Sequence, residues 1–457
     1  MRPVIDIKDA RKTALYILDR LQQKQSTLNA IMADANRILS AMTSRDRALT
    51  QTIVYGVLRW QRRLDAYITH FSKINLKRID PIVLNLLRIG MFQILYLDRV
   101  PNFAAVNTTV QMAKAHAPTW VVKYVNGLLR EAVRKHADLS LPVDSSDPIK
   151  TLCIQKSFPT WLIQRWLDRF GEKETLSLCD AINKIPEMTL RVNPLKNSRQ
   201  QVLKFLQAEA DSVFMTPYSP LGLQISGLHR AVDQMPSFKE GAFQVQDEAA
   251  QLVTRVLDPK PGETILDACA GLGGKTSHIA QAVENQGHIV AADRSSKKLH
   301  LLQQEMKRLD IHCVKTQTID WNRADPKKNL PKFDRILVDA PCSGIGVMRR
   351  NPDIKWQIGK SNLDRYGQHQ IAILSNTAPF VKPKGVVIYS VCSFEPEENE
   401  FVINGFLKNH SEFAKEDIGP YDPDEIVNLG CENGFVRTFP HHHAMDGFFI
   451  ARLKKIR

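Results

Sequence analysis

The chain has 457 residues, of which 43% are hydrophobic, 24% charged and 7% aromatic. This length allows about three domains, and the composition excludes disordered, collagen-like and membrane-spanning classes. The net charge is +14, and residues 1–141 carry +12 of it, so we expect a polyanionic partner for the first third of the chain. Because no run of eighteen apolar residues and no secretory signal pattern occurs, we expect a cytoplasmic protein that does not enter a membrane.

Residues 8–137 show helical periodicity throughout and predict an all-α bundle. Pro81 stands near the start of its most apolar stretch, where a first-turn proline is tolerated, and Pro101 marks the end. Basic residues are interleaved at helix ends and on polar faces, where they could meet phosphates. They are Arg45, Arg47, Arg59, Arg62, Arg63, Lys77 and Arg78.

The segment 140–148 is rich in Ser, Asp and Pro and is the best candidate for a linker. Mixed helix and strand patterns follow it, and from residue 245 onward strands and helices alternate, which is typical of a doubly wound parallel sheet. We therefore expect three parts: an all-α bundle at 1–140, a linker with a small α+β subdomain at 141–240, and an α/β Rossmann-like domain at 241–457.

The chemistry-bearing residues follow predicted strands. The strand ETILDACA leads into the turn AGLGGKT, whose glycines at 271, 273 and 274 let a ligand approach a helix N-terminus, and Asp293 ends the next strand. A carboxylate there can accept hydrogen bonds from ribose hydroxyls. Because the glycines match neither a P-loop nor a dinucleotide motif, the pattern favours an adenosyl cofactor.

Two further strand ends, DAPCSG and YSVCSFEPEENE, each carry a cysteine, Cys342 and Cys392. Two thiols beside a cofactor site indicate covalent catalysis, because sulfur is strongly nucleophilic, whereas two packed structural cysteines are the alternative. The pattern alone does not decide which cysteine attacks. None of the seven cysteines forms a C-x-x-C pair, so we expect neither a disulfide framework nor a metal site.

The motifs DACAGLGGKT, FDRILVDAPCSGIGVMRRNPDIKW and YSVCSFEPEENE resemble those of the RNA cytosine-C5 methyltransferases that use S-adenosyl-L-methionine. The N-terminal stretches VPNFAAVNTTVQMAKAH and KYVNGLLR are similar to the NusB antitermination fold. Their fusion to this catalytic domain is characteristic of the RsmB (Sun/Fmu) family. RVNP, QDEAAQLV and DGFFIARLKK also fit, so the resemblance covers essentially the whole chain.

The resemblance implies a role for each motif residue. Cys392 would be the nucleophile that adds to C6 of cytosine, Cys342 would assist product release, and Asp339 would contact the base. Asp293 would bind the ribose and Asp320 the adenine edge, while Arg349, Arg350 and Lys355 would meet RNA phosphates. The implied cofactor-binding set is Cys269, Ala270, Gly271, Leu272, Gly273, Gly274, Lys275, Asp293, Asp320 and Asp339.

The chain departs from the family pattern in two motifs. Gly271 and Leu272 replace a common Ala-Pro pair, and Val391 replaces a Thr before the nucleophile. The expected activity is methylation of C5 of one cytosine in 16S rRNA, alone or in a small-subunit assembly intermediate, by a monomer without metal. The alternatives are the same reaction on tRNA, and a noncatalytic RNA-binding or antitermination-like factor.

Overall fold

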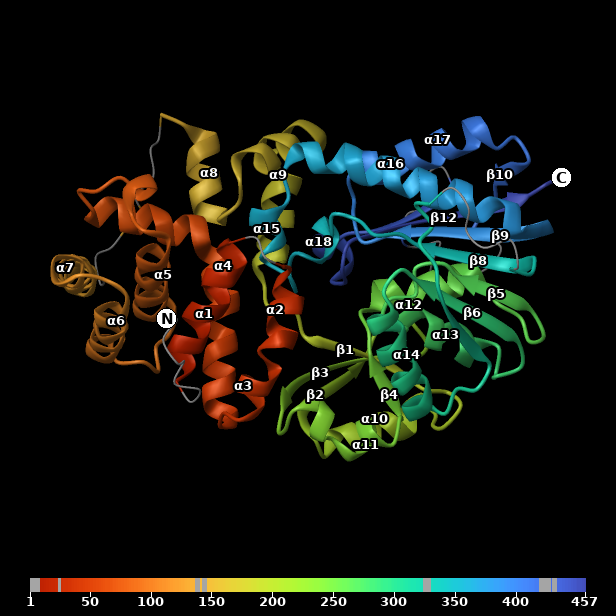
Figure 1. Ribbon diagram of the computed structural model, residues 1–457, viewed down its shortest axis with the longest axis horizontal. Helices are drawn as coiled ribbons and strands as arrows, with labels where there is room; N and C mark the ends of the chain where they lie inside the picture. The colour runs from red at the N-terminus through yellow and green to blue at the C-terminus, as the bar shows by residue number, and fades with distance from the viewer. Residues whose placement is uncertain are drawn as a thin grey trace. The chain divides into compact units, whose positions relative to one another are not determined.

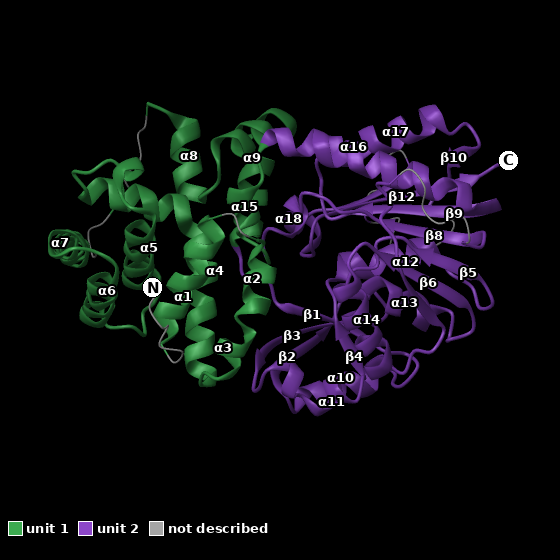
Figure 2. Ribbon diagram, in the orientation of Figure 1, with its two compact units in different colours: residues 1–183, 350–359 green, residues 184–349, 360–457 purple. Residues whose placement is uncertain are grey.

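The computed structural model describes residues 9–23, 26–135, 140–141, 146–323, 330–418, 429 and 434–457. They belong to two compact units, residues 1–183 with 350–359 and residues 184–349 with 360–457 (Figure 2). None of the helices in these described ranges combines the length and the hydropathy that a membrane span needs.

The first unit is helical, as its periodicity predicts (Figure 1). Its central helix α5 starts at Pro81, and the Asp80 side chain caps it by accepting hydrogen bonds from the backbone N–H groups of Ile82 and Val83. All side chains from 83 to 94 are buried, so α5 forms the middle of the core. The helices are α1 (Ala10–Gln22), α2 (Leu28–Asp34), α3 (Asn36–Ser40), α4 (Ser44–Phe71), α5 (Pro81–Tyr96), α6 (Asn102–His116), α7 (Thr119–Lys135), α8 (Pro148–Lys156), α9 (Thr160–Asn183) and α15 (Ile354–Gln357).

The compact units do not divide at the expected boundary near residue 140, because α8 and α9 join the helical unit. The Arg59 guanidinium of α4 donates a hydrogen bond to the carbonyl of Ile182 at 3.0 Å, and Arg62 donates to the carbonyl of Phe158 at 3.2 Å. The first contact is buried and the second partly buried, and together they tie α9 and the turn before it to α4. The expected linker at 140–148 lies partly outside the described residues, and Asp147 at its end caps α8.

The second unit begins with a small antiparallel sheet in the order β2-β3-β1-β4. Leu190 and Val192 of β1 pack with Val202 and Leu206 of helix α10 in its core. The elements are β1 (Met188–Val192), α10 (Arg199–Gln207), β2 (Ala210–Met215), β3 (Gly222–Leu228), α11 (Pro236–Lys239) and β4 (Phe243–Val245).

A larger sheet follows in the order β10-β12-β9-β8-β5-β6-β7, with β11 paired to β12. The pairs among β5 to β9 are parallel, which confirms the Rossmann-like prediction, whereas the closing strands β10 to β12 pair antiparallel. Its strands are β5 (Thr264–Asp267), β6 (His288–Asp293), β7 (Val314–Thr318), β8 (Phe333–Asp339), β9 (Val381–Val391), β10 (Phe413–Lys415), β11 (Phe435–Thr438) and β12 (Phe448–Lys455).

Helices cover both faces of this sheet, and alternate residues of one strand enter different cores. Ile265 packs in the core formed with α12 (Glu248–Leu257), α13 (Gly274–Ala282) and α14 (Ser296–Leu309). Leu266 packs in the core formed with α16 (Lys360–Thr377) and α17 (Glu400–Asn409). The carboxyl ends of β8, β5, β6 and β7 therefore meet along one edge, where ligands bind in open α/β sheets.

Candidate active site

The two motif cysteines come together at the ends of neighbouring parallel strands. Asp339 of β8 pairs in register with Ser390 of β9, and each cysteine follows its strand within three residues. The Cys342 and Cys392 sulfurs lie 3.2 Å apart, and both residues are half-buried. The hydrogen bond to Cys392 and burial raise the pKa of Cys342 well above its ordinary value. Cys342 therefore keeps its proton at neutral pH.

A buried glutamate that the sequence interpretation overlooked holds both cysteine loops. Glu398 accepts hydrogen bonds from the backbone N–H of Ser343 at 2.7 Å, from the Ser343 hydroxyl at 2.5 Å and from the Ser393 hydroxyl at 2.6 Å. These two serines directly follow Cys342 and Cys392. The pKa of Glu398 lies above its ordinary value, because the effect of burial outweighs the opposing effect of the hydrogen bonds from Ser343 and Ser393. The only sequence signal was its place in the EENE motif.

Asp339 bridges the cysteine loops and the glycine-rich turn. Its Oδ2 lies 2.6 Å from the Lys275 ammonium, and its Oδ1 accepts a hydrogen bond from the Ser390 hydroxyl at 2.7 Å. Lys275 belongs to the first turn of α13, so this ion pair joins the end of β8 to the turn after β5. The Asp339 side chain is thereby held in a single orientation.

The glycine-rich turn has the backbone that its glycines predict. Gly271 and Gly273 have φ of 55° and 88°, and Gly273 precedes the N-terminus of α13. A Cβ on Gly273 would lie 2.7 Å from the Leu302 side chain, so the packing itself requires glycine there. Asp293 accepts hydrogen bonds from the backbone N–H of Gly271 at 3.0 Å and of Ser295 at 2.8 Å. The turn is thus fixed to the end of β6.

The remaining residues of the predicted cofactor set lie on or beside the same edge. Asp320 follows β7 and accepts a hydrogen bond from the backbone N–H of Asn322 at 3.1 Å, with its side chain 35% exposed. Ala270 is buried and Leu272 is exposed. Burial and the nearby Asp267 raise the pKa of Cys269 well above its ordinary value, so this thiol is inert. Cys269 fits the predicted cofactor set only through its position in the turn.

Asp267, at the end of β5, is a second residue that the sequence interpretation did not assign. It is 1% exposed, and its Oδ2 accepts a hydrogen bond from the Thr276 hydroxyl at 2.6 Å. Its Oδ1 has no hydrogen-bond partner among the described residues. Burial raises the pKa of Asp267 from 3.8 to about 7. The folded protein therefore binds this proton more tightly than the unfolded chain does.

This shift predicts a pH dependence of stability. The contribution of Asp267 to the free energy of unfolding is largest below pH 4 and falls as the pH rises toward 7, by at most about 1.4 kcal/mol per pH unit. Asp267→Asn, which carries no titrating proton, should therefore gain stability relative to the wild type between pH 4 and 7, as urea unfolding would measure. Asp364→Asn, on an exposed face of α16, is the control. Parallel pH curves for Asp267→Asn and the wild type would contradict the assignment.

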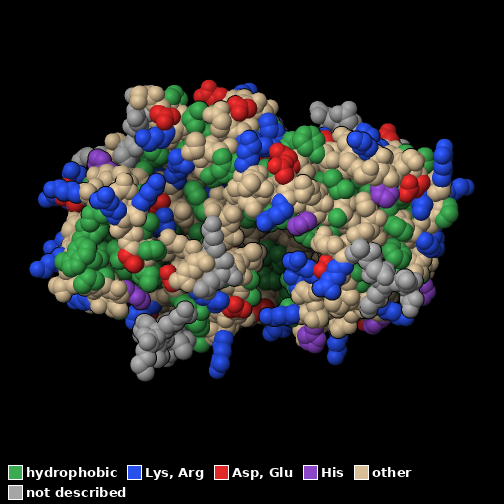
Figure 3. Space-filling view, turned by 45° about the horizontal axis from the view of Figure 1, so that its top comes forward, with side chains coloured by type: hydrophobic (Ala, Val, Ile, Leu, Met, Phe, Trp, Pro, Cys, Tyr) green, Lys and Arg blue, Asp and Glu red, His purple; other side chains and the backbone are tan. Residues whose placement is uncertain are grey.

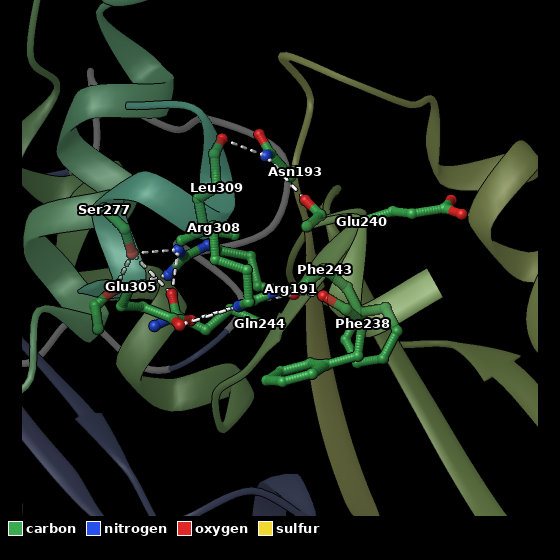
Figure 4. A network of polar contacts seen from close by, with 12 residues as sticks. Arg191, Asn193, Phe238, Glu240, Phe243, Gln244, Ser277, Glu305, Arg308 and Leu309 are labelled. Atoms are coloured by element: carbon green, nitrogen blue, oxygen red, sulfur yellow. Dashed lines mark hydrogen bonds and ion pairs between the residues drawn. The ribbon is translucent and has the colours of Figure 1, made fainter. Parts of the chain in front are cut away.

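Arg191 of β1 joins the small sheet to the glycine-rich turn (Figure 4). It is fully buried, and its acceptors are all uncharged. Burial lowers the pKa of Arg191 to about 9, so the guanidinium stays protonated at neutral pH. A buried positive charge thus lies against the first turn of α13, where the helix dipole also favours an anion. Its acceptors are Gly274 O at 2.7 Å, Ser277 Oγ at 2.7 Å, Gln244 Oε1 at 2.8 Å, Gln281 Oε1 at 3.2 Å and Gln246 Oε1.

If the turn holds the adenosyl cofactor that the sequence predicts, Arg191→Met should lower the affinity for S-adenosylhomocysteine roughly tenfold or more, because the turn loses its anchor and the adjacent charge. It should also lower the free energy of unfolding by about 2–4 kcal/mol, since buried acceptors lose their donors. Calorimetric titration and urea unfolding measure the two effects. Arg199→Met is the matched control, because Arg199 donates to the Thr216 and Gly222 carbonyls within the small subdomain. If both variants bind the probe equally well, Arg191 does not position the turn.

Two residues expected to meet RNA phosphates are instead buried. Arg349 is 7% exposed and pairs with Asp446 at 2.5 Å and Asp247 at 2.9 Å. Lys355 is 1% exposed and donates a hydrogen bond to the Asn183 side chain at 2.6 Å within the helical unit. These expectations were wrong, because tertiary contacts bury both charges: Arg349 pairs with two carboxylates, whereas uncharged oxygens accept from Lys355. Arg350 is half-buried.

The Rossmann-like sheet, the glycine-rich turn and the paired cysteines together define a methyltransferase. Three family models match the chain: 16S rRNA methyltransferase RsmB/F at residues 254–454, the NusB family at 8–134, and the ferredoxin-like domain of RsmF/B-like methyltransferases at 158–231. The chain belongs to the RsmB/F family of 16S rRNA methyltransferases.

Relatives match over nearly the full length. The chain is 37% identical to a probable ribosomal RNA small subunit methyltransferase B of Synechocystis, covering 98% of this chain and 99% of that protein. It is 33% identical to a protein of the same description in Bacillus subtilis, covering 97% and 98%. Among solved structures, PH0851 has a TM-score of 0.81 and 29% identity with full coverage of both chains. A methyltransferase homologue from Pyrococcus horikoshii has a TM-score of 0.57 and 28% identity, covering 68% of this chain and 100% of that one.

Proposed function

We propose that this protein methylates C5 of one cytosine in 16S rRNA and that S-adenosyl-L-methionine supplies the methyl group. The observation that carries the proposal is the pair of sulfurs 3.2 Å apart, on strand ends that the ion pair of Asp339 and Lys275 connects to the glycine-rich turn. The names of the full-length relatives support ribosomal RNA as the substrate. We also propose that the protein acts as a cytoplasmic monomer.

The residues at the sheet edge fit an adenosyl cofactor. A Cβ on Gly271 would meet only the Cys269 carbonyl oxygen, at 4.0 Å, so a ligand can reach the backbone of the turn. Asp293 uses one lone pair on each oxygen for the backbone and keeps others for ribose hydroxyls, and Asp320 at the next strand end offers an acceptor for the adenine amino group. The Lys275 ammonium and the Arg191 guanidinium favour a carboxylate beside the turn. Cys269, Ala270, Leu272, Gly273 and Gly274 shape this backbone.

In the proposed reaction Cys392 adds as a thiolate to C6 of the cytosine, which makes C5 nucleophilic enough to accept a methyl group. Water then takes the C5 proton, the electron pair of that C–H bond forms the C5–C6 double bond of the aromatic ring, and the bond between Cys392 and C6 breaks with its electron pair on the Cys392 sulfur. Cys342, which keeps its proton, lies next to the leaving sulfur and assists this release. Asp339 would contact the N3/N4 edge of the base. Because the reaction occurs on the base, the cytosine must leave its stack.

The domain roles belong to the same proposal. We assign RNA binding to the NusB-like part at 1–140 and to residues 141–240, which combine α8 and α9 of the helical unit with most of the small antiparallel sheet, and catalysis to 241–457. The same chemistry on tRNA is the second candidate, since catalytic motifs report chemistry better than substrate. A noncatalytic RNA-binding or antitermination-like factor is disfavoured, because such a factor needs none of Cys342, Cys392, Asp339 and Lys275.

The test is methyl transfer from labelled S-adenosyl-L-methionine to unmodified 16S rRNA transcribed in vitro, with bisulfite sequencing of the product. We expect label at C5 of a single cytosine. Small-subunit assembly intermediates serve as a second substrate, and unmodified tRNA as the competitor. Transfer to tRNA alone would favour the second candidate, and no transfer to any of these RNAs would contradict the proposal.

A further inference from the structure

A groove of about 480 Å³ lies between α6 and α7 in the helical unit. Its apolar floor is formed by Val106, which is buried in the core of the unit, and by Val110, Val122 and Val133, which are partly buried against the same core. Figure 3 shows hydrophobic side chains gathered at the left end of the molecule, where α6 and α7 lie in Figure 1, with Lys and Arg side chains nearby. This surface is separate from the cysteine and cofactor residues, which belong to the other compact unit.

The charges around the groove have one sign. Lys114, Lys123 and Arg130 line it and are exposed, and no Asp or Glu lines it. In the described part of the chain none of the three forms an ion pair or a side-chain hydrogen bond. Arg59 and Arg62 of α4 differ, since they donate hydrogen bonds to carbonyls of their own unit. The groove cations are therefore free to meet phosphates.

The groove also carries an aromatic ring and amide groups. Phe103 is 78% exposed, which is unusual for so large an apolar side chain. Asn102, Asn107 and Asn126 line the groove beside it and can donate to or accept from base edges. An exposed aromatic ring, an apolar floor and unpaired cations are the elements of a sequence-tolerant single-stranded nucleic acid site.

We propose that the α6–α7 groove binds a single-stranded segment of RNA, with bases stacked on Phe103 and the valine floor and phosphates at Lys114, Lys123 and Arg130. Because all charges that line the groove are positive, RNA is favoured as its occupant over an apolar protein helix. The inference rests on the proposed function, because the bound segment would be part of the RNA substrate. It adds a docking site on a unit that contains neither cysteine of the active site.

The test is the affinity of the full chain for a fluorescein-labelled single-stranded 12-nucleotide RNA, measured by anisotropy over a range of salt concentrations. The variant Lys114→Glu/Lys123→Glu/Arg130→Glu should lose at least roughly tenfold in affinity near 0.15 M salt, and the slope of log K against log salt should shrink by about 2. Phe103→Ala should lose about fivefold to a hundredfold, with the slope unchanged. All four side chains are exposed, so circular dichroism should report an intact fold.

The matched control is Lys73→Glu/Lys150→Glu/Lys173→Glu, which makes the same charge change at exposed positions elsewhere in the unit. Equal losses in the two triple variants would overturn the inference, because total charge would then explain binding. The inference would also be overturned if the groove variant bound RNA as tightly as the wild type does. Loss of a protein partner by that variant, with RNA affinity unchanged, would mean that the groove binds protein. Methyl transfer by the wild type to 16S rRNA is measured in parallel, so that failure of the proposed function is seen separately from failure of the groove.

Discussion

Cys392→Ala is expected to lower methyl transfer at least roughly a thousandfold, whereas Cys342→Ala is expected to trap the RNA on the protein. Without Cys392 no thiolate is available to activate C5, so neither product nor adduct forms. Without Cys342 the adduct forms, but its release is slow, since the proton donor 3.2 Å from the leaving sulfur is missing. A retarded band on a denaturing gel measures the adduct, and labelled methyl transfer measures turnover.

Cys313→Ala is the control, because Cys313 is a half-buried free thiol outside the site. It should retain activity within about twofold of the wild type and leave no adduct. The double variant lacking both cysteines should form no adduct either, since the attacking sulfur is gone. Equal loss of turnover in the two single variants, with no retarded band for Cys342→Ala, would contradict the division of labour between the cysteines.

Glu398→Ala is expected to lower kcat roughly a hundredfold, because the two cysteine loops lose the carboxylate that holds both in place. Ser343 N, Ser343 Oγ and Ser393 Oγ would each lose a buried acceptor. The free energy of unfolding should fall by about 2–4 kcal/mol for the same reason. Glu398→Gln keeps the shape and one carbonyl acceptor, so it should recover most of the stability and part of the activity. Steady-state kinetics and urea unfolding measure these effects.

The rate at which Cys342 and Cys392 form a disulfide tests whether Glu398 positions them, because a loss of stability alone would not change that rate in the folded protein. Diamide, a thiol oxidant, should join Cys342 and Cys392 quickly in the wild type, because their sulfurs are already in contact. The same reaction should be slower in Glu398→Ala at a temperature where that variant is folded. Glu284→Gln, at an exposed turn after α13, is the surface control. An unchanged oxidation rate in Glu398→Ala would mean that Glu398 does not set the separation of the thiols.

Much of the fold follows from local patterns in the sequence. The five parallel strands lie where the alternation of predicted strands and helices after residue 245 puts them, and α5 begins at the first-turn proline Pro81. The glycine-rich turn also follows from its residues, since only glycine readily adopts the positive φ at 271 and 273. Backbone preference, periodicity and turn chemistry act over a few residues, so they can be read from the chain alone.

Only the tertiary structure decides which charged and polar groups face each other. Arg349 and Lys355 look like solvated charges in a basic segment, yet both are buried, and α8 and α9 join the helical unit through carbonyls that meet Arg59 and Arg62. These pairings join positions far apart in the chain, so they produce no periodic pattern in the sequence from which they could be predicted. The same holds for the bonds from Arg191 to the turn and from Glu398 to both cysteine loops.

The net charge of the first third is a final example. Its sum, +12 over residues 1–141, is a property of the sequence and predicts a polyanionic partner. Which cations remain available is decided by folding, because a buried guanidinium must find acceptors inside the protein whereas an exposed ammonium can remain hydrated. Arg59 and Arg62 are satisfied internally, whereas Lys114, Lys123 and Arg130 remain exposed around the α6–α7 groove.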